Sequence, residues 1–288
     1  MSAPRANSSS ELYSSQSGDD SDSLSNSNST PSDPNNSPHH RLRPTESLTS
    51  RIATFKQQFL PQLREILGEE KYNLFQAENS RMASSGLEKQ ALKVGDIGPD
   101  FTLPNYDGSM YNLNNELQSH HVIVHFYRGA WCPYCNFSLQ AHSEFLDEYD
   151  DYNATFVAIT PQLPEVITTS VNQADHQYAF PILSDNHLEV IPAYHLLFTL
   201  SPELQQIHIN GLNVSLAQYY GNDKGDLPIP ATYILERKTG KIVWAHVEWD
   251  FTVRADPLDI IEELQKLKTQ EESVAVNQLN QLGISKKR

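Results

Sequence analysis

Cysteine, basic residues and long apolar runs are all scarce in this chain of 288 residues. Two cysteines are too few for a secreted fold built on disulfides. The 21 basic residues face 36 acidic ones, and the net charge of −15 disfavours nucleic acid and anionic membranes as partners. The longest apolar stretches, around 121–126 and 193–200, fall well short of the roughly 20 residues that span a bilayer. We therefore expect neither nucleic-acid nor membrane partners.

The N-terminus lacks the apolar core of a signal peptide, and Asp19, Asp20 and Asp22 argue against an acid-poor transit peptide. We therefore expect the protein in the cytoplasm. Residues 1–45 are mostly Ser, Asn, Asp, Pro and Gln, and they hold too few apolar side chains to offset the entropy of ordering. This composition predicts a disordered tail whose serines are candidate phosphorylation sites.

A helical extension is predicted over residues 46–91. Apolar residues recur there at helical spacing, at Leu48, Ile52, Phe55, Phe59, Leu63, Ile66 and Leu67. Thr45 or Ser47 is placed to cap its start, and Pro61 is expected to end one helix and begin the next. The apolar stripe needs a cover, and both packing on the main domain and contact with a second copy in a homodimer remain open.

Residues 92–267 alternate strand and helix patterns and form the predicted main domain. Strands are expected over 121–126, 155–160, 196–200, 232–235 and 241–247, and helices after Cys132, over 164–175 and over 257–267. The last two strands are separated by a short turn containing Gly240, which predicts a hairpin. This order predicts an α/β fold with a mixed central β-sheet flanked by helices. A polar C-terminal tail is expected over 268–288.

Both cysteines lie within residues 126–135, directly after the first apolar strand of the domain. A strand that ends in a loop and continues as a helix places Cys132 at the helix N-terminus. Unpaired backbone N–H groups and the helix dipole stabilise a thiolate there. Cys132 is therefore the predicted reactive thiol, and Arg128 adds positive charge. The spacing brings the two Cα atoms near disulfide distance, so Cys135 is the predicted resolving partner.

A metal site and a pair of inert thiols are the alternatives to redox chemistry that remain open for the two cysteines. Zinc usually takes four ligands, so a metal site would need two more from His125, His142 or other residues. No second cysteine pair with finger-like spacing exists. Burial of two inert thiols does not by itself explain their shared position at a strand-to-helix junction. We favour redox chemistry, which requires no metal and no other cofactor.

Four segments resemble the peroxiredoxin (alkyl hydroperoxide reductase/thiol-specific antioxidant) family of the thioredoxin-fold superfamily. Residues 94–104, followed by Asp107-Gly108, are similar to the family's opening, and residues 126–135 to an active-site loop of the form Arg-Gly-x-Trp-Cys-Pro-Tyr-Cys. Residues 180–185 resemble a further family segment, and residues 229–233 resemble the segment that carries the cis-proline of thioredoxin folds. The resemblance covers residues 92–267 and implies a thioredoxin-like fold.

The resemblance also implies a thiol peroxidase recycled by thioredoxin. Cys132 would attack the O–O bond of a hydroperoxide and become a sulfenic acid, and Cys135 would condense with it to a disulfide. A dithiol such as thioredoxin would then reduce the pair. Pro230, in the cis form, would lie against the disulfide and shape where a partner docks. The alternative function is a protein thiol–disulfide oxidoreductase without peroxidase activity.

The chain departs from the family pattern at two positions. Peroxiredoxins typically carry Thr or Ser three residues before the peroxidatic cysteine, where this chain has Gly129. Hydrogen bonds to a peroxide must then come from backbone N–H groups and Arg128. Peroxiredoxins also tend to carry an arginine near the strand that begins here at Ala231, and this chain has Pro230 there. Arg254 is the other arginine available to fold back toward the site.

Two more side chains belong to the predicted site. His125 lies near the position where thioredoxins keep a buried acid that takes the proton from the deeper cysteine. A general-base role and a purely structural role for His125 both remain open. Trp131 is expected either to cover the sulfurs and offer an apolar docking face or to pack in the core.

Overall fold

The structure is a computed structural model that describes residues 46–174 and 178–281. The predicted tail over 1–45 lies outside the described residues, as do residues 282–288. The helices are α1 (Leu48–Ser85), α2 (Leu113–Leu117), α3 (Pro133–Ser143), α4 (Leu146–Asp151), α5 (Pro164–Gln173), α6 (Val190–Ala193), α7 (Pro202–Asn210), α8 (Leu216–Tyr220) and α9 (Pro257–Gln281), with a short 3-10 helix over Leu87–Lys89. None of these described helices combines the length and apolar character needed to cross a bilayer.

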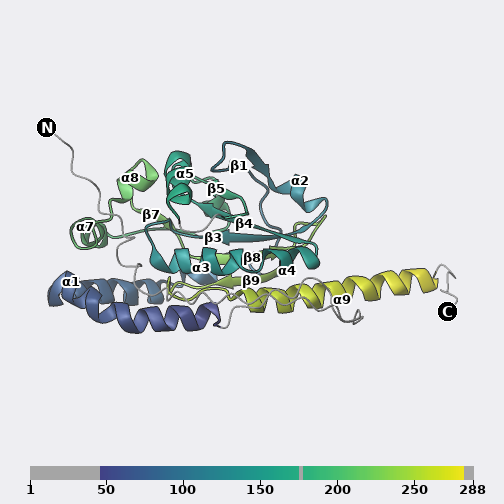
Figure 1. Cartoon of the computed structure of the whole chain (residues 1–288), viewed down its shortest axis with the longest axis horizontal. Coiled ribbons are helices and arrows are strands. Elements are labelled where there is room, and N and C mark those ends of the chain that lie inside the picture. The colour runs from purple at the N-terminus through teal and green to yellow at the C-terminus, as the bar shows by residue number, and fades with distance from the viewer. Residues whose placement is uncertain (1–45, 175–177, 282–288) are drawn as a thin grey trace, which may run out of the picture. The chain divides into compact units, whose positions relative to one another are not determined.

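A five-stranded mixed sheet forms the centre of the domain, in the order β5-β4-β3-β8-β9 (Figure 1). Its strands are β3 (His121–Phe126), β4 (Ala154–Thr160), β5 (Ile182–Ser184), β8 (Ala231–Leu235) and β9 (Ile242–Val247). The pairs β3–β4 and β4–β5 are parallel, whereas β3–β8 and β8–β9 are antiparallel. The predicted α/β fold with a mixed central sheet is therefore confirmed.

Alternation along the central strand divides the core between the two faces of the sheet. Ile123 belongs to the cluster shared with α1, α3 and α9, whereas its neighbours Val122 and Val124 belong to the cluster on the opposite face, with α2 and α6. Every residue of β3 is buried, as expected for a strand with neighbours on both edges and helices on both faces. The loop that follows β3 thus starts from the buried central strand of the sheet.

The predicted hairpin is present as β8 and β9, and its turn places Lys238 and Gly240 at φ 66°. The strand predicted over 196–200 is shorter, β6 (Leu197–Thr199), and it pairs with β7 (Asp226–Pro228) outside the central sheet. A second small sheet joins β1 (Thr102–Pro104) to β2 (Met110–Asn112). The apolar pattern of residues 196–200 predicted a strand but did not indicate which sheet β6 would join.

Helix α1 continues through Pro61, so the prediction that this proline separates two helices is wrong. The interruption lies at Gly68, whose φ of 71° and ψ of 162° are outside the helical region. A proline inside a helix removes one hydrogen bond, and here packing of the apolar face on both sides of Pro61 compensates for that loss. Gly68 adopts a backbone conformation that is essentially restricted to glycine. Ser47 caps the start, as predicted, by accepting from the Ser50 amide at 3.2 Å.

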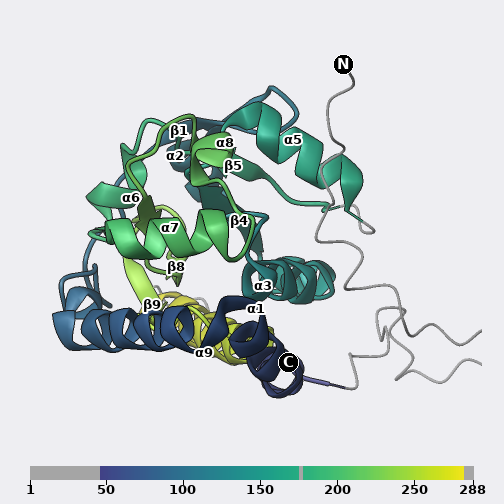
Figure 2. The same ribbon diagram turned by 90° about the vertical axis from the view of Figure 1, so that its left-hand side faces the viewer.

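The apolar stripe of α1 packs on the main domain of the same chain. Helix α1 contacts α3 and α7, beside α9 (Figure 2). Its buried side chains are Leu48, Ile52, Leu63, Leu67, Phe75 and Met82. Polar contacts fasten the first part, where Arg51 pairs with Glu144 at 2.6 Å and Lys56 donates to the Thr252 hydroxyl at 2.8 Å. This packing covers the stripe within one chain, and the homodimer stays a prediction.

The polar C-terminal tail expected from residue 268 is instead helical as far as Gln281, because α9 continues without a break. Val274, Val276 and Leu279 are exposed on this last part. Glu, Gln, Leu and Ala have favourable helix propensities, which supports a solvent-exposed continuation of a helix already started by packing. The polar composition after residue 268 correctly indicated exposure to solvent, but it did not indicate that these residues are helical.

Candidate active site

The two cysteines lie where β3 leads into α3. Cys132 is the N-cap of α3, Pro133 occupies the first helical position, and the Cys132 carbonyl accepts from the Cys135 amide at 3.0 Å. Both thiols are reduced, and both side chains have no exposed surface. The placement of Cys132 at the helix N-terminus agrees with the sequence analysis.

Arg128 contacts the sulfur of Cys132 directly. Its Nη2 donates to Cys132 Sγ at 3.1 Å. The guanidinium carbon lies 4.8 Å from the ring centre of Trp131 and 4.0 Å from that of Phe251. Aromatic contacts of this kind stabilise a cation that is removed from water, and Arg128 is only 6% exposed. The geometry therefore fixes a positive charge against Cys132.

A second arginine contacts the deeper sulfur. Arg254, which follows β9 in the chain, donates from Nη2 to Cys135 Sγ at 3.5 Å and from Nη1 to the Val253 carbonyl at 2.9 Å. Its side chain is buried. The position of Arg254 could not be predicted, because no sequence pattern near it indicates a contact with the cysteines.

The two thiols influence each other's pKa. Burial raises the pKa of both thiols, because a thiolate is poorly solvated there. Burial is outweighed at Cys135 by the hydrogen bond with Cys132 and the charges of Arg254 and Arg128, and the pKa of Cys135 lies well below its ordinary value. At Cys132, burial and the hydrogen bond with Cys135 outweigh the charge of Arg128, and the pKa lies well above its ordinary value. The surroundings therefore favour the thiolate form more strongly at Cys135 than at Cys132.

The assignment of the reactive thiolate to Cys132 stays a prediction. The prediction considered the helix N-terminus and Arg128 but not Arg254, which stabilises charge on the deeper sulfur. A negative charge on Cys132 is in turn favoured by the charges of Arg128 and Arg254, which lower its pKa. Arg128 is in contact with Cys132 to stabilise the charge at that position.

The loop before Cys132 is held by hydrogen bonds from other parts of the fold. Tyr220 of α8 donates to the Arg128 carbonyl and accepts from Trp131 Nε1, both at 2.7 Å. Gln162 accepts from the Ala130 amide at 2.8 Å. Trp131 is 9% exposed, so it packs in the core and presents no free docking face. These contacts fix both Arg128 and Trp131 relative to the helix start.

Aromatic side chains from α1 and from the segment after β9 cover this arrangement. Phe251, stacked over Arg128, makes edge contacts with Phe75 of α1 at 6.4 Å and with Tyr134 of α3 at 5.8 Å between ring centres. Phe55 of α1 contacts Tyr134 from the other side at 5.4 Å. The predicted helical extension thus forms part of the site's cover, a role that its periodicity did not indicate.

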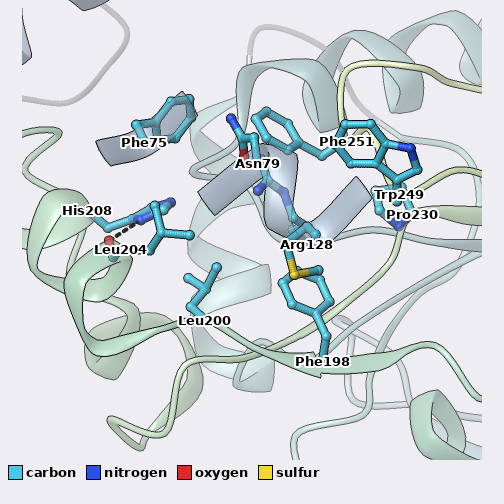
Figure 3. Close-up of a pocket in the computed structure, with 11 residues that line it drawn as sticks. Phe75, Asn79, Arg128, Phe198, Leu200, Leu204, His208, Pro230, Trp249 and Phe251 are labelled. Atoms are coloured by element: carbon cyan, nitrogen blue, oxygen red, sulfur yellow. Dashed lines mark hydrogen bonds between the residues drawn. The ribbon is translucent and has the colours of Figure 1, made fainter. Parts of the chain in front are cut away.

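A cavity of about 30 Å³ lies beside Arg128 (Figure 3). It holds about two water-sized spheres, a volume suited to a very small molecule. Phe75, Leu204 and His208 lie on one side of Arg128 in this view, and Pro230 and Trp249 lie on the other. The lining is completed by Asn79, Met82, Phe198, Leu200 and Phe251. Arg128 therefore connects this cavity to the sulfur of Cys132.

His125 lies below α3 and is fully buried. Its Nδ1 is 2.9 Å from the Thr232 hydroxyl, and its Nε2 is 3.5 Å from the Ser138 hydroxyl, one helical turn beyond Cys135. Burial and the nearby positive groups, His142 first, hold the pKa of His125 well below its ordinary value. Among the described residues it forms no hydrogen bond to either sulfur, and its general-base role stays a prediction.

No group of three or more His, Cys, Asp or Glu side chains in the described part of the chain is arranged to hold a metal ion. His142, named with His125 as a possible third or fourth ligand, points instead to the Tyr149 hydroxyl, with 2.9 Å between Nδ1 and oxygen. The groups nearest the two sulfurs are the arginines, whose positive charge would oppose a bound cation.

Comparison with known proteins assigns the family. The profile of the AhpC/TSA family matches residues 94–245, which is more than half of the chain. The chain belongs to the AhpC/TSA family. Over 103 residues it is 33% identical to a putative peroxiredoxin of Mycobacterium tuberculosis, covering 36% of this chain and 64% of that protein. Over 99 residues it is 31% identical to Peroxiredoxin Bcp of Escherichia coli, covering 34% and 62% respectively.

These two matches span slightly less than two thirds of the relatives' own length. Among solved structures, the reduced 2-Cys peroxiredoxin of Plasmodium vivax aligns with a TM-score of 0.50 at 15% identity, covering 63% of this chain and 84% of that chain. At that identity the likeness concerns the fold, and the predicted thioredoxin-like fold is confirmed. Phe75, Phe251 and Arg254 all lie outside the segment that matches the AhpC/TSA profile.

Gly129 accounts for one departure from the AhpC/TSA pattern. A Cβ atom added at this position would lie 2.8 Å from Trp131 Nε1 and 3.2 Å from Gln162 Cδ. Contacts below 3.0 Å are essentially never formed by real Cβ atoms. A threonine or serine at 129 would therefore displace the Trp131 ring, which is fixed by its bond to Tyr220. In this chain the indole occupies the space that a hydroxyl-bearing side chain would need.

The expected cis form of Pro230 is wrong, because the described residues contain no cis peptide bond. The chain passes from β7 through Pro230 into β8 in an extended course, with the Ile229 amide bonded to the Leu196 carbonyl at 2.8 Å and the Pro230 carbonyl accepting from Glu248 at 3.4 Å. These bonds suit the trans form, which is intrinsically favoured. Pro230 lines the cavity near Arg128, so its predicted closeness to the site is retained.

Proposed function

We propose that this protein is a thiol peroxidase in which Cys132 reduces hydroperoxides and Cys135 resolves the product, with a dithiol protein such as thioredoxin as reductant. The observation that carries the proposal is the position of Arg128, which lines the small cavity and donates to Cys132 Sγ at 3.1 Å. Membership of the AhpC/TSA family supports the same chemistry. The relatives' names associate that family with peroxiredoxins.

The reaction balances when the thiol pair starts with one proton, on Cys135, and one negative charge, on Cys132. The Cys132 thiolate attacks the hydroxyl oxygen of ROOH. A sulfur–oxygen bond forms and the O–O bond breaks, so the sulfur is oxidised by two electrons, and RO⁻ leaves and takes the proton of Cys135 to become ROH. The Cys135 thiolate then attacks the sulfenic acid, which forms the disulfide and releases hydroxide. Arg128 stabilises the negative charge that passes from sulfur to oxygen.

Single cysteine variants test this assignment. Cys132→Ser should consume no peroxide, whereas Cys135→Ser should consume one equivalent and stop as a sulfenic acid that dimedone traps. Mass spectrometry of the trapped adduct identifies the oxidised residue. If Cys132→Ser forms the adduct and Cys135→Ser does not, then Cys135 is the peroxidatic residue and our assignment is reversed.

The reductant is tested by steady-state peroxide consumption with thioredoxin, thioredoxin reductase and NADPH. Repeated turnover by the wild-type protein supports the full cycle, and the Cys135→Ser variant serves as the matched control that lacks the resolving thiol. Turnover no faster than that of a free thiol would eliminate the peroxidase proposal. A protein thiol–disulfide oxidoreductase would instead reduce a disulfide substrate under the same conditions.

A further inference from the structure

The cavity beside Arg128 is lined by polar groups whose hydrogen-bonding capacity is not fully used, Arg128 Nε among them. Three of its lining residues carry polar side chains, namely Arg128, Asn79 and His208. Arg128 can only donate hydrogen bonds. His208, on α7, is 3% exposed, and its ring meets the edge of Trp131 at 5.4 Å between centroids.

The hydrogen bond that His208 forms determines which of its ring nitrogens can accept a further hydrogen bond. Nδ1 lies 2.8 Å from the Leu204 carbonyl, an acceptor, so Nδ1 carries the proton and Nε2 carries the lone pair. Among the described residues, nothing bonds to Nε2. Burial lowers the pKa of His208 to about 4, so the ring is neutral at neutral pH and the lone pair is available. Arg128 thus supplies hydrogen-bond donors on one side of the cavity, and His208 Nε2 supplies a fixed acceptor on another side.

A hydroperoxide is chemically matched to this pair. It has one O–H donor and two oxygens that accept, and the hydrogen peroxide molecule is close in size to the two water-sized spheres that the cavity holds. Gly129 supplies no hydroxyl to orient such a substrate. The role therefore has to be filled from another element.

We propose that His208 Nε2 accepts the hydroperoxide O–H while Arg128 donates to the peroxide oxygens, so that His208 orients the substrate for Cys132. This inference rests on the proposed peroxidase function and adds a residue of α7 to the site. His208 takes up no proton in the step. It holds the peroxide O–H group while the Cys132 thiolate attacks the hydroxyl oxygen. Arg128 stabilises the charge of the alkoxide that leaves.

Two variants of His208 separate this role from a structural one. Asn in His208→Asn places its amide nitrogen near the Nδ1 position, so it keeps the bond to Leu204 and removes the acceptor at Nε2. Gln in His208→Gln reaches the Nε2 position and can offer its oxygen there, but it gives up the Leu204 bond. A purely structural role of His208 predicts that His208→Asn is the milder change.

The measurements are the second-order rate of oxidation by hydrogen peroxide and the rate of alkylation by iodoacetamide, which has no O–H donor. We expect His208→Asn to lower the peroxide rate about tenfold to a hundredfold, by loss of one bond to the reacting group, with alkylation changed less than about twofold. His208→Gln should retain most of the peroxide rate. Asn79→Leu removes the third polar side chain of the cavity, and it should lower the peroxide rate less than His208→Asn does.

Three results would overturn the inference: an unchanged peroxide rate in His208→Asn, an equal fall in both rates, or a large fall in Asn79→Leu that identifies Asn79 as the acceptor. Failure of the peroxidase function itself is distinguishable, because the wild-type protein would then react with peroxide no faster than a free thiol. If His208→Asn does not fold, as judged by circular dichroism, the ratio of peroxide to alkylation rate in His208→Gln decides: a ratio near wild type supports the acceptor role, and a tenfold lower ratio overturns it.

Discussion

Phe251 holds the cover over the buried cysteines, and replacing it with leucine tests that role quantitatively. The ring lies 4.0 Å from the Arg128 guanidinium and makes edge contacts with Phe75 and Tyr134. A cation–π contact removed from water contributes about 2 kcal/mol, and each aromatic pair about 0.5–1.5 kcal/mol. Leucine keeps most of the apolar burial and loses the ring contacts. Because neighbouring contacts are not additive, we expect Phe251→Leu to lower the free energy of unfolding by roughly 3 kcal/mol.

The same substitution should expose the thiols more often. Cys132 and Cys135 have no exposed surface, so alkylation requires a local opening. Loss of about 2 kcal/mol from the contact over Arg128 raises the open population about 30-fold, since 1.4 kcal/mol corresponds to a factor of ten. We therefore expect iodoacetamide to modify Cys132 about 30 times faster in Phe251→Leu, as measured by quenched mass spectrometry with peptide mapping.

Phe198→Leu is the matched control, because Phe198 lines the same cavity and forms no ring or cation contact with any residue that the structure describes. This change should cost less than about 1.5 kcal/mol in urea unfolding and alter alkylation less than about threefold. Equal alkylation rates in the two leucine variants would refute the idea that Phe251 holds the cover closed.

Two further predictions concern stability. His142 is fully buried and burial lowers its pKa to about 3, so the unfolded chain protonates first as the pH falls below about 6.5 and stability is lost. Protonation of His142 in the unfolded chain lowers the free energy of unfolding by about 2 kcal/mol between pH 7.5 and pH 5. His142→Phe should therefore reduce the loss of stability over this pH range by about 2 kcal/mol. The same loss of stability in the variant and the wild type would contradict this prediction. Gly68→Ala should lower stability by about 1–3 kcal/mol although its methyl group meets nothing within 4 Å, because only the backbone conformation is strained. Urea unfolding measures the stability of each variant. The control Ser84→Ala, at an exposed position of the same helix, should change stability by less than about 0.5 kcal/mol. Equal effects of Gly68→Ala and Ser84→Ala would show that Gly68 carries no strain.

The central parts of the site were predictable because their signals are local. An apolar strand, a short loop and a proline after Cys132 are consecutive in the sequence, and they specify a thiol at a helix N-terminus. Arg128 is four residues from Cys132 and forms part of the same motif. The strand over 121–126 was predicted to the residue, because Val122, Ile123 and Val124 form the apolar centre of a strand that is buried throughout.

The remaining parts come from distant elements and have no local signature. Arg254 is separated from Cys135 by 119 residues and His208 belongs to an ordinary amphipathic helix, so neither position differs from its surroundings in the sequence. The effect of Arg254 on the pKa of Cys135 was missed for the same reason, because Arg254 acts on Cys135 only in the folded chain. The helix break was assigned to Pro61 because proline is the stronger local signal, but packing tolerated it and the chain turned at Gly68.

The AhpC/TSA profile ends at residue 245, and the chain needs both flanks to complete the surroundings of its sulfurs. Phe75 precedes that segment, whereas Phe251 and Arg254 follow it. A fragment limited to residues 94–245 would keep the two cysteines of the motif. It would lose the aromatic cover near Cys132 and the positive charge of Arg254 beside Cys135. Transferring the motif alone into another protein would likewise move its amino acids without the charged groups that surround them in this fold. The functional unit of this protein is therefore longer than its family signature.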